Sequence, residues 1–132
     1  MNICLFAAAC LMFILAAAHS VLGEIKIFRK MKDVQTLPVL KGIPLLRNDP
    51  DAAKLTLRMV WHLLTALALG PISILGYFSF LSSLNGTEIF VVKMTAASMF
   101  LSFLISLIFS KGKHAAWIAF LAIGILCMTG IG

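Results

Sequence analysis

The stretch ICLFAAACLMFILAAAHSVL, residues 3–22, contains no Asp, Glu, Lys or Arg, and its one histidine is His19. A helix needs about 20 mostly apolar residues to cross the hydrocarbon core of a bilayer. In lipid the backbone must satisfy its own hydrogen bonds, which an α-helix does within the segment. The stretch therefore predicts a transmembrane helix. Because no basic region precedes it, we expect this helix to be retained and not cleaved as a signal peptide.

Three more apolar stretches follow, at residues 55–81, 89–109 and 115–131. Of the 132 residues, 61% are hydrophobic and only 12% are charged, which is more apolar surface than a soluble domain of this length can bury. The second and third connections are too short for anything but hairpins between adjacent helices. The predicted fold is an all-α four-helix transmembrane bundle, with residues 1–132 forming a single integral membrane domain.

The net charge of +6 comes from basic residues that flank the apolar stretches. Anionic lipid headgroups lie at that depth, so we interpret the charge as membrane-facing and expect no nucleic-acid partner. The second connection, residues 82–88, has no Lys or Arg, whereas the third holds Lys111 and Lys113. The first connection is surrounded by Lys26, Arg29, Lys30, Lys32, Lys41, Arg47, Lys54 and Arg58. The positive-inside rule then predicts cytoplasmic first and third connections and both termini outside.

The first connection is long enough to hold more than a turn. Residues 24–32 are predicted to continue the first helix past the bilayer as an interfacial stretch. Residues 37–46 are apolar and twice interrupted by proline, so we expect them on the membrane surface or against the helix ends. Asp49 is a predicted N-cap, and Pro50 is predicted to begin the second helix.

Local signals predict further detail. Asn85 and Glu88 have the spacing of a capping box for the third helix, and Pro71 predicts a bend in the second. Gly124 belongs to a predicted close-packing face on the fourth helix. A stripe of hydroxyls on the third helix is predicted to pack against another helix rather than line a polar conduit. The stripe consists of Ser98, Ser102, Ser106 and Ser110.

The three cysteines, Cys4, Cys10 and Cys127, lie inside apolar stretches. None shows the C-x-x-C spacing of metal or redox sites, so we interpret them as packing groups. Cys4 and Cys127 fall near the same predicted membrane face. A disulfide between them is open from the sequence alone.

The most specific signal is a set of three histidines on three predicted helices. His19, His62 and His114 each lie within a few residues of the predicted cytoplasmic end of their helix, and Glu24 is close by in sequence. Since a helix rises about 1.5 Å per residue, their depths differ by only a turn or two. These four side chains form a candidate ligand set for a divalent metal. Alternatively, two of the histidines are candidate axial ligands for haem. A proton relay and independent contacts with helix ends or headgroups are the alternatives.

Residues 19–24 read HSVLGE, and residues 57–62, after a basic loop containing prolines, read LRMVWH. This combination resembles an HSxxGE...WH pattern found in uncharacterised small bacterial four-span membrane proteins, over about the first half of the chain. The resemblance implies a bacterial inner-membrane location. It also favours a pairing of His19, Glu24 and His62, and it implies no particular activity.

Function is therefore open between three classes. The first is an auxiliary or structural membrane component, with lipid and a homo-oligomer or larger complex as partners. The second is a metal- or haem-binding membrane protein that uses the four-residue cluster. The third is an oligomeric transporter or channel unit; the chain resembles small multidrug exporters in length and span number, but residues 1–23 lack their intramembrane carboxylate.

Overall fold

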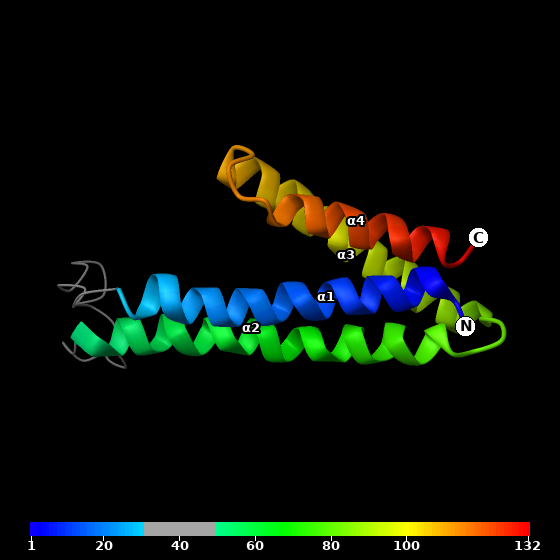
Figure 1. The fold of residues 1–132 in the computed structure, drawn as a ribbon, viewed down its shortest axis with the longest axis horizontal. Coiled ribbons are helices and arrows are strands. Elements are labelled where there is room, and N and C mark those ends of the chain that lie inside the picture. Colours follow the sequence, from blue (N-terminus) through cyan, green and yellow to red (C-terminus); the bar gives the residue numbers. More distant parts are fainter. Residues whose placement is uncertain (31–49) are drawn as a thin grey trace. The chain divides into compact units, whose positions relative to one another are not determined.

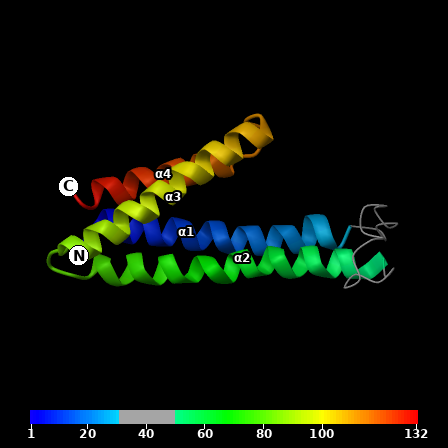
Figure 2. The same ribbon diagram turned by 180° about the vertical axis from the view of Figure 1, so that it is seen from behind.

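The computed structural model describes residues 1–30 and 50–132, with side chains for residues 1–30 and 54–132. Within those residues the chain is all-helical and contains no strand, as predicted. The elements in chain order are α1 (Ile3–Leu22), the π-helix η1 (Gly23–Phe28), α2 (Pro50–Ser79), α3 (Gly86–Ser110) and α4 (Ala116–Thr129). Figures 1 and 2 label the α-helices.

The helix bounds follow the apolar stretches closely, with one exception. The first helix begins and ends where predicted, and α2 begins at Pro50, a residue suited to the first helical position. The fourth helix is shorter than predicted: α4 has 14 residues and ends at Thr129 instead of continuing to Ile131. The predictions for residues 37–46 and for Asp49 lie outside the described residues.

Contacts divide the chain into two compact units, which we describe separately. The terminal unit comprises residues 1–15 and 68–132, and the hairpin unit comprises residues 16–67. The boundary falls inside α1 and α2, so both helices contribute to both units. In each unit α1 and α2 run side by side in opposite directions (Figures 1 and 2).

The core of the terminal unit contains residues from all four helices. Small side chains allow close approach: a Cβ at Gly124 would lie 2.7 Å from Cε1 of Phe100, so the predicted packing role of Gly124 is confirmed. All three cysteines are free, with Cys127 buried in this core. The buried core cluster consists of Leu5, Ala8, Ala9, Met12, Leu75, Val92, Ala96, Ile123 and Cys127.

Asn2 links three helix ends in the same unit. Its backbone N–H donates to the carbonyl of Ser79 at 2.6 Å, and its side-chain Nδ2 donates to the carbonyl of Gly130 at 2.6 Å. Its Oδ1 accepts from the backbone N–H of Leu5 at 3.2 Å. These bonds satisfy end groups of α1, α2 and α4 that would otherwise lack helical partners.

The turns around α3 have clear physical causes. Asn85 accepts from the N–H groups of Thr87 and Glu88, and Glu88 accepts from the N–H of Asn85 at 2.7 Å, so the predicted capping box is confirmed. The other end of α3 closes at Lys111 and Gly112, with φ of 50° and 75°. Both residues adopt left-handed backbone, which ends a helix readily at glycine and at some cost elsewhere.

Two hydroxyls of the serine stripe are satisfied within α3, while its predicted packing against another helix stays a prediction. The hydroxyls of Ser98 and Ser102 donate to the carbonyls four residues earlier, at 3.0 and 2.8 Å, so they need neither water nor a partner helix. Ser98 is exposed, however, and the face of α3 that enters the core carries Val92 and Ala96. The small residues that pack within this chain are therefore on a different face from Ser98.

Candidate functional site

A polar cluster joins η1 to α2 in the hairpin unit. The Arg58 guanidinium donates from Nε to Glu24 Oε2 at 2.9 Å and from Nη2 to Glu24 Oε1 at 2.6 Å. This bidentate geometry is the strongest form of a carboxylate–arginine pair. The Glu24 side chain is 20% exposed and that of Arg58 is 49% exposed, so the carboxylate is the more enclosed partner. The pair neutralises Glu24 where the apolar part of α1 gives way to basic residues.

His62 lies between Glu24 and Ser20. Its Nδ1 is 2.6 Å from the hydroxyl oxygen of Ser20, and its Nε2 is 3.5 Å from Oε2 of Glu24. The two ring nitrogens thus face an alcohol on one side and a carboxylate on the other. A carboxylate favours the tautomer that carries the proton on the nitrogen facing it. Nδ1 is then left as the acceptor for the Ser20 hydroxyl.

Aromatic packing fixes the backbone beside this cluster. The indole of Trp61 stacks on the imidazole of His19, with ring centroids 4.1 Å apart and an interplanar angle of 5°. The Trp61 Nε1–H also donates to the carbonyl of His19 at 2.9 Å. Phe28 meets the indole edge-on at 5.7 Å. His19 thus contacts Trp61, which directly precedes His62 in the sequence.

Gly23 makes the close contact between α1 and α2 possible. A Cβ at this position would lie 2.5 Å from Cε2 of Trp61, which no real side chain tolerates. Its lack of a side chain lets the indole lie directly against the backbone. Gly23 also begins η1, in which the N–H of Arg29 donates to the carbonyl of Glu24, five residues earlier, at 3.0 Å. Such π-type turns recur at functional sites.

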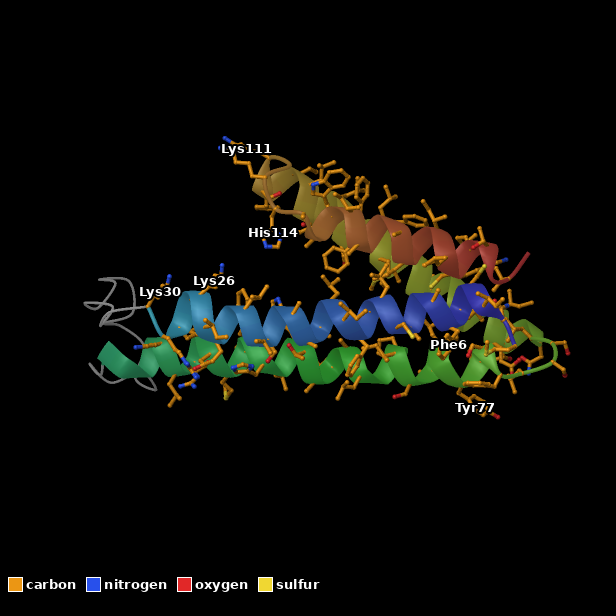
Figure 3. The ribbon with its side chains drawn as sticks, viewed as in Figure 1. Phe6, Lys26, Lys30, Tyr77, Lys111 and His114 are labelled. Carbon is orange, nitrogen blue, oxygen red and sulfur yellow. The ribbon has the colours of Figure 1, made fainter. Side chains whose placement is uncertain are left out.

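The fourth predicted ligand, His114, belongs to the terminal unit, at the connection between α3 and α4 (Figure 3). It is exposed, and its Nδ1 accepts from the N–H of Ala116 at 3.3 Å. Among the side chains described, those of residues 1–30 and 54–132, no group of three or more His, Cys, Asp or Glu is placed to hold a metal ion. Convergence of His114 with the other three residues therefore stays a prediction, as does a metal or haem bound by them.

Sequence reasoning identified most of this cluster but overlooked one member. The sequence predicts His19, His62 and Glu24 as parts of one cluster. Ser20 and Gly23, which neighbour His19 and Glu24 in the sequence, also contact α2. From the sequence alone, Arg58 is predicted only as one of the basic residues that set the orientation in the membrane. The signal for this pair in the sequence is Glu24, the first acidic residue after the first span, together with Arg58 four positions before His62, at ends of helices that face each other.

Comparison with protein family models, with curated proteins and with solved structures finds no match to this chain. The resemblance to small bacterial four-span proteins thus stays a prediction.

Proposed function

We propose that the chain is a four-span integral membrane protein that serves as an auxiliary component of a bacterial inner membrane. The observation that supports this most strongly is the length and apolar exposure of its helices. Three segments, Ile3–Phe28, Lys54–Ser79 and Gly86–Ser110, are long and apolar enough to cross a membrane. In water their surfaces would be very costly, since each Å² of apolar area exposed costs about 25 cal/mol.

The second span illustrates the point. Leu55, Leu63 and Leu67 are 66%, 53% and 64% exposed, and only 6% of the most apolar part of this segment is buried within the chain. Soluble monomers rarely expose continuous apolar surface of this extent. Lipid acyl chains can surround such a surface, so the helix does not have to be buried by other parts of the protein.

The fourth span rests on α4, which is apolar but has only 14 residues. At about 1.5 Å per residue it covers about 21 Å, less than the hydrocarbon thickness of about 30 Å. Local thinning of the bilayer and the turns at each end of the helix accommodate such a difference at modest cost. With four spans, both termini lie on the same side.

The proposed orientation rests on the cations. Lys26, Arg29 and Lys30 are exposed at the end of η1, and Lys111 and Lys113 are exposed between α3 and α4. Figure 3 shows Lys26 and Lys30 extending from the hairpin unit on the side turned away from α2. Under the positive-inside rule these two connections are cytoplasmic.

An auxiliary role agrees with the way the hairpin unit is held together. Its polar side chains bind one another: Glu24 pairs with Arg58, and Ser20 pairs with His62. Its aromatic rings pack between α1 and α2. A hairpin fixed in this way suits a small component that presents a constant surface to lipid or to a larger complex.

Membrane extraction tests the proposal. We expect the expressed chain to stay in the membrane pellet after washing with alkaline carbonate and with high salt, and to be released only by detergent. Release by carbonate or salt would show that the exposed apolar helices are not inserted, and it would contradict the proposal.

A further inference from the structure

We propose that Ser20 is a nucleophile, that His62 is its general base, and that Glu24 and Arg58 position the imidazole, so that the site can take acyl groups from lipid esters. This inference rests on the proposed membrane insertion and goes beyond the auxiliary role. It starts from the order of contacts Ser20–His62–Glu24, an alcohol, an imidazole and a carboxylate in line. The alcohol and carboxylate lie on the α1–η1 segment, and the imidazole on α2.

The distances suit proton transfer. The Ser20 Oγ to His62 Nδ1 separation of 2.6 Å is within the range in which a base removes a hydroxyl proton. On the opposite edge of the ring, Glu24 Oε2 lies 3.5 Å from Nε2, so the carboxylate faces the nitrogen that carries the ring proton when Nδ1 acts as the base. Ser20 thus differs from Ser98 and Ser102, whose hydroxyls donate to carbonyls of their own helix.

The positioning groups are themselves fixed. Arg58 holds both oxygens of Glu24, which limits rotation of the carboxylate. The Phe28 ring lies 6.5 Å from the imidazole of His62, and neighbouring Trp61 is bound to α1 by stacking and a hydrogen bond. A base whose partners are held in this way loses little entropy on reaching its working geometry.

Depth in the membrane identifies the substrate class. Ser20 lies near the end of the apolar stretch that closes at Leu22, and the exposed cations Lys26, Arg29 and Lys30 follow within a few turns. Ester groups of glycerolipids lie at this same boundary, between acyl chains and headgroups. The His62 side chain is 40% exposed, so it is open to its surroundings there.

The step balances with lipid and water alone. The Ser20 Oγ attacks the ester carbonyl carbon while His62 Nδ1 takes the hydroxyl proton, which forms a tetrahedral oxyanion. The carbon–alkoxy bond then breaks, and the leaving alcohol takes the proton from His62, which leaves an acyl-serine. Water, activated by the same nitrogen, releases the fatty acid and restores Ser20. We assign to His62 only the general-base contribution, about 10²–10⁴-fold.

This chemistry and a metal at His62 require opposite tautomers. Metal binding at Nε2 needs the lone pair there and puts the proton on Nδ1, which would then donate to Ser20. The triad needs the proton on Nε2 and the lone pair on Nδ1. In the structure the Ser20 hydroxyl faces Nδ1 and the Glu24 carboxylate faces Nε2, which is the arrangement that the triad needs.

An active-site probe tests the inference. A fluorophosphonate with a long alkyl chain reacts with activated serines, forming a serine–phosphorus bond and releasing fluoride. We expect it to label the detergent-solubilised full chain at Ser20, as located by mass spectrometry, and not to label the heat-denatured chain. Chelation with EDTA should leave the labelling unchanged.

Variants separate the roles. His62→Gln should lower the labelling rate by about 10²-fold, Glu24→Gln should lower it severalfold, and Glu24→Asp should restore part of it. Ser102→Ala and His114→Gln are matched controls that should label like the parent. Circular dichroism and gel filtration establish that each variant is folded. No label on the folded parent, label elsewhere than Ser20, or a folded His62→Gln that labels at the parental rate would overturn the inference, whereas failed membrane insertion would appear separately in the extraction experiment.

Discussion

At the residue scale, Gly23 explains how α1 and α2 come so close. The Trp61 indole occupies the space that any side chain at position 23 would need. Three interactions depend on this approach: the stacking of Trp61 on His19, the hydrogen bond from its indole, and the contact with Phe28. The absence of a side chain at position 23 thus permits the aromatic packing beside the polar cluster.

Replacing Gly23 with Ala should therefore destabilise the protein by about 1–3 kcal/mol, because the methyl group displaces the indole. Gly70 provides the matched control, since a Cβ there meets nothing within 4 Å. Gly70→Ala should leave stability unchanged or raise it by up to about 1 kcal/mol. Thermal unfolding in detergent, followed by circular dichroism, measures both, and equal melting temperatures for the two variants would contradict the packing account.

The pair of Arg58 and Glu24 makes a second prediction at this scale. Arg58 is about half exposed, so the interaction should contribute at most about 1 kcal/mol. A double-mutant cycle with Arg58→Met and Glu24→Gln should give a coupling energy of that size, and raised salt should reduce it. A coupling energy of zero at low salt would show that the bidentate pair adds nothing to stability.

At the element scale, the sequence predicts the positions of the helices better than it predicts how they end or where the π-helix forms. Apolar length alone placed α1, and the spacing of Asn85 and Glu88 placed the start of α3. The sequence predicts only a continuing helix at the π-helix Gly23–Phe28; in the structure Trp61 and Arg58 of α2 contact its first two residues, and such contacts between distant residues have no local signal. The sequence also predicts a longer fourth helix; in the structure α4 ends at Thr129, and Gly130 lies against Leu5 of α1.

The capping box at Asn85 allows a test of what stabilises the start of α3. Asn85→Ala removes the acceptor for two backbone N–H groups and should cost about 1 kcal/mol. Asn85→Asp keeps the acceptor and is the control, which should stay close to the parent in stability. If the alanine variant unfolds at the same temperature as the aspartate variant, the cap does not hold the start of α3.

The serines of α3 give a second test at this scale. Ser98 and Ser102 already satisfy their hydroxyls within the helix, so replacing Ser102 and Ser106 with Ala should cost little, about 0.6 kcal/mol for each hydroxyl. The variant should retain the membrane extraction behaviour and the melting temperature of the parent within a few degrees. A large loss of stability would place this stripe in an interface with another helix.

At the scale of the whole molecule, the account depends on both sides of the membrane being assigned correctly. Lys26, Arg29 and Lys30 follow the first span, and Lys111 and Lys113 follow the third, so the first and third connections should share one side. The turn at residues 82–88 has no Lys or Arg and should lie opposite. This orientation decides which face of the membrane each connection, and the Ser20 cluster beside the first connection, lies on.

Cysteine labelling in intact cells measures this orientation directly. In a chain with Cys4, Cys10 and Cys127 replaced by Ala, single cysteines are introduced as Ser83→Cys, Gln35→Cys and Gly112→Cys and exposed to a membrane-impermeant maleimide. We predict that the cysteine at position 83 reacts in intact cells and that those at 35 and 112 react only after the membrane is permeabilised. Reaction at 35 and 112 with protection at 83, or reaction of all three from outside, would contradict the four-span orientation.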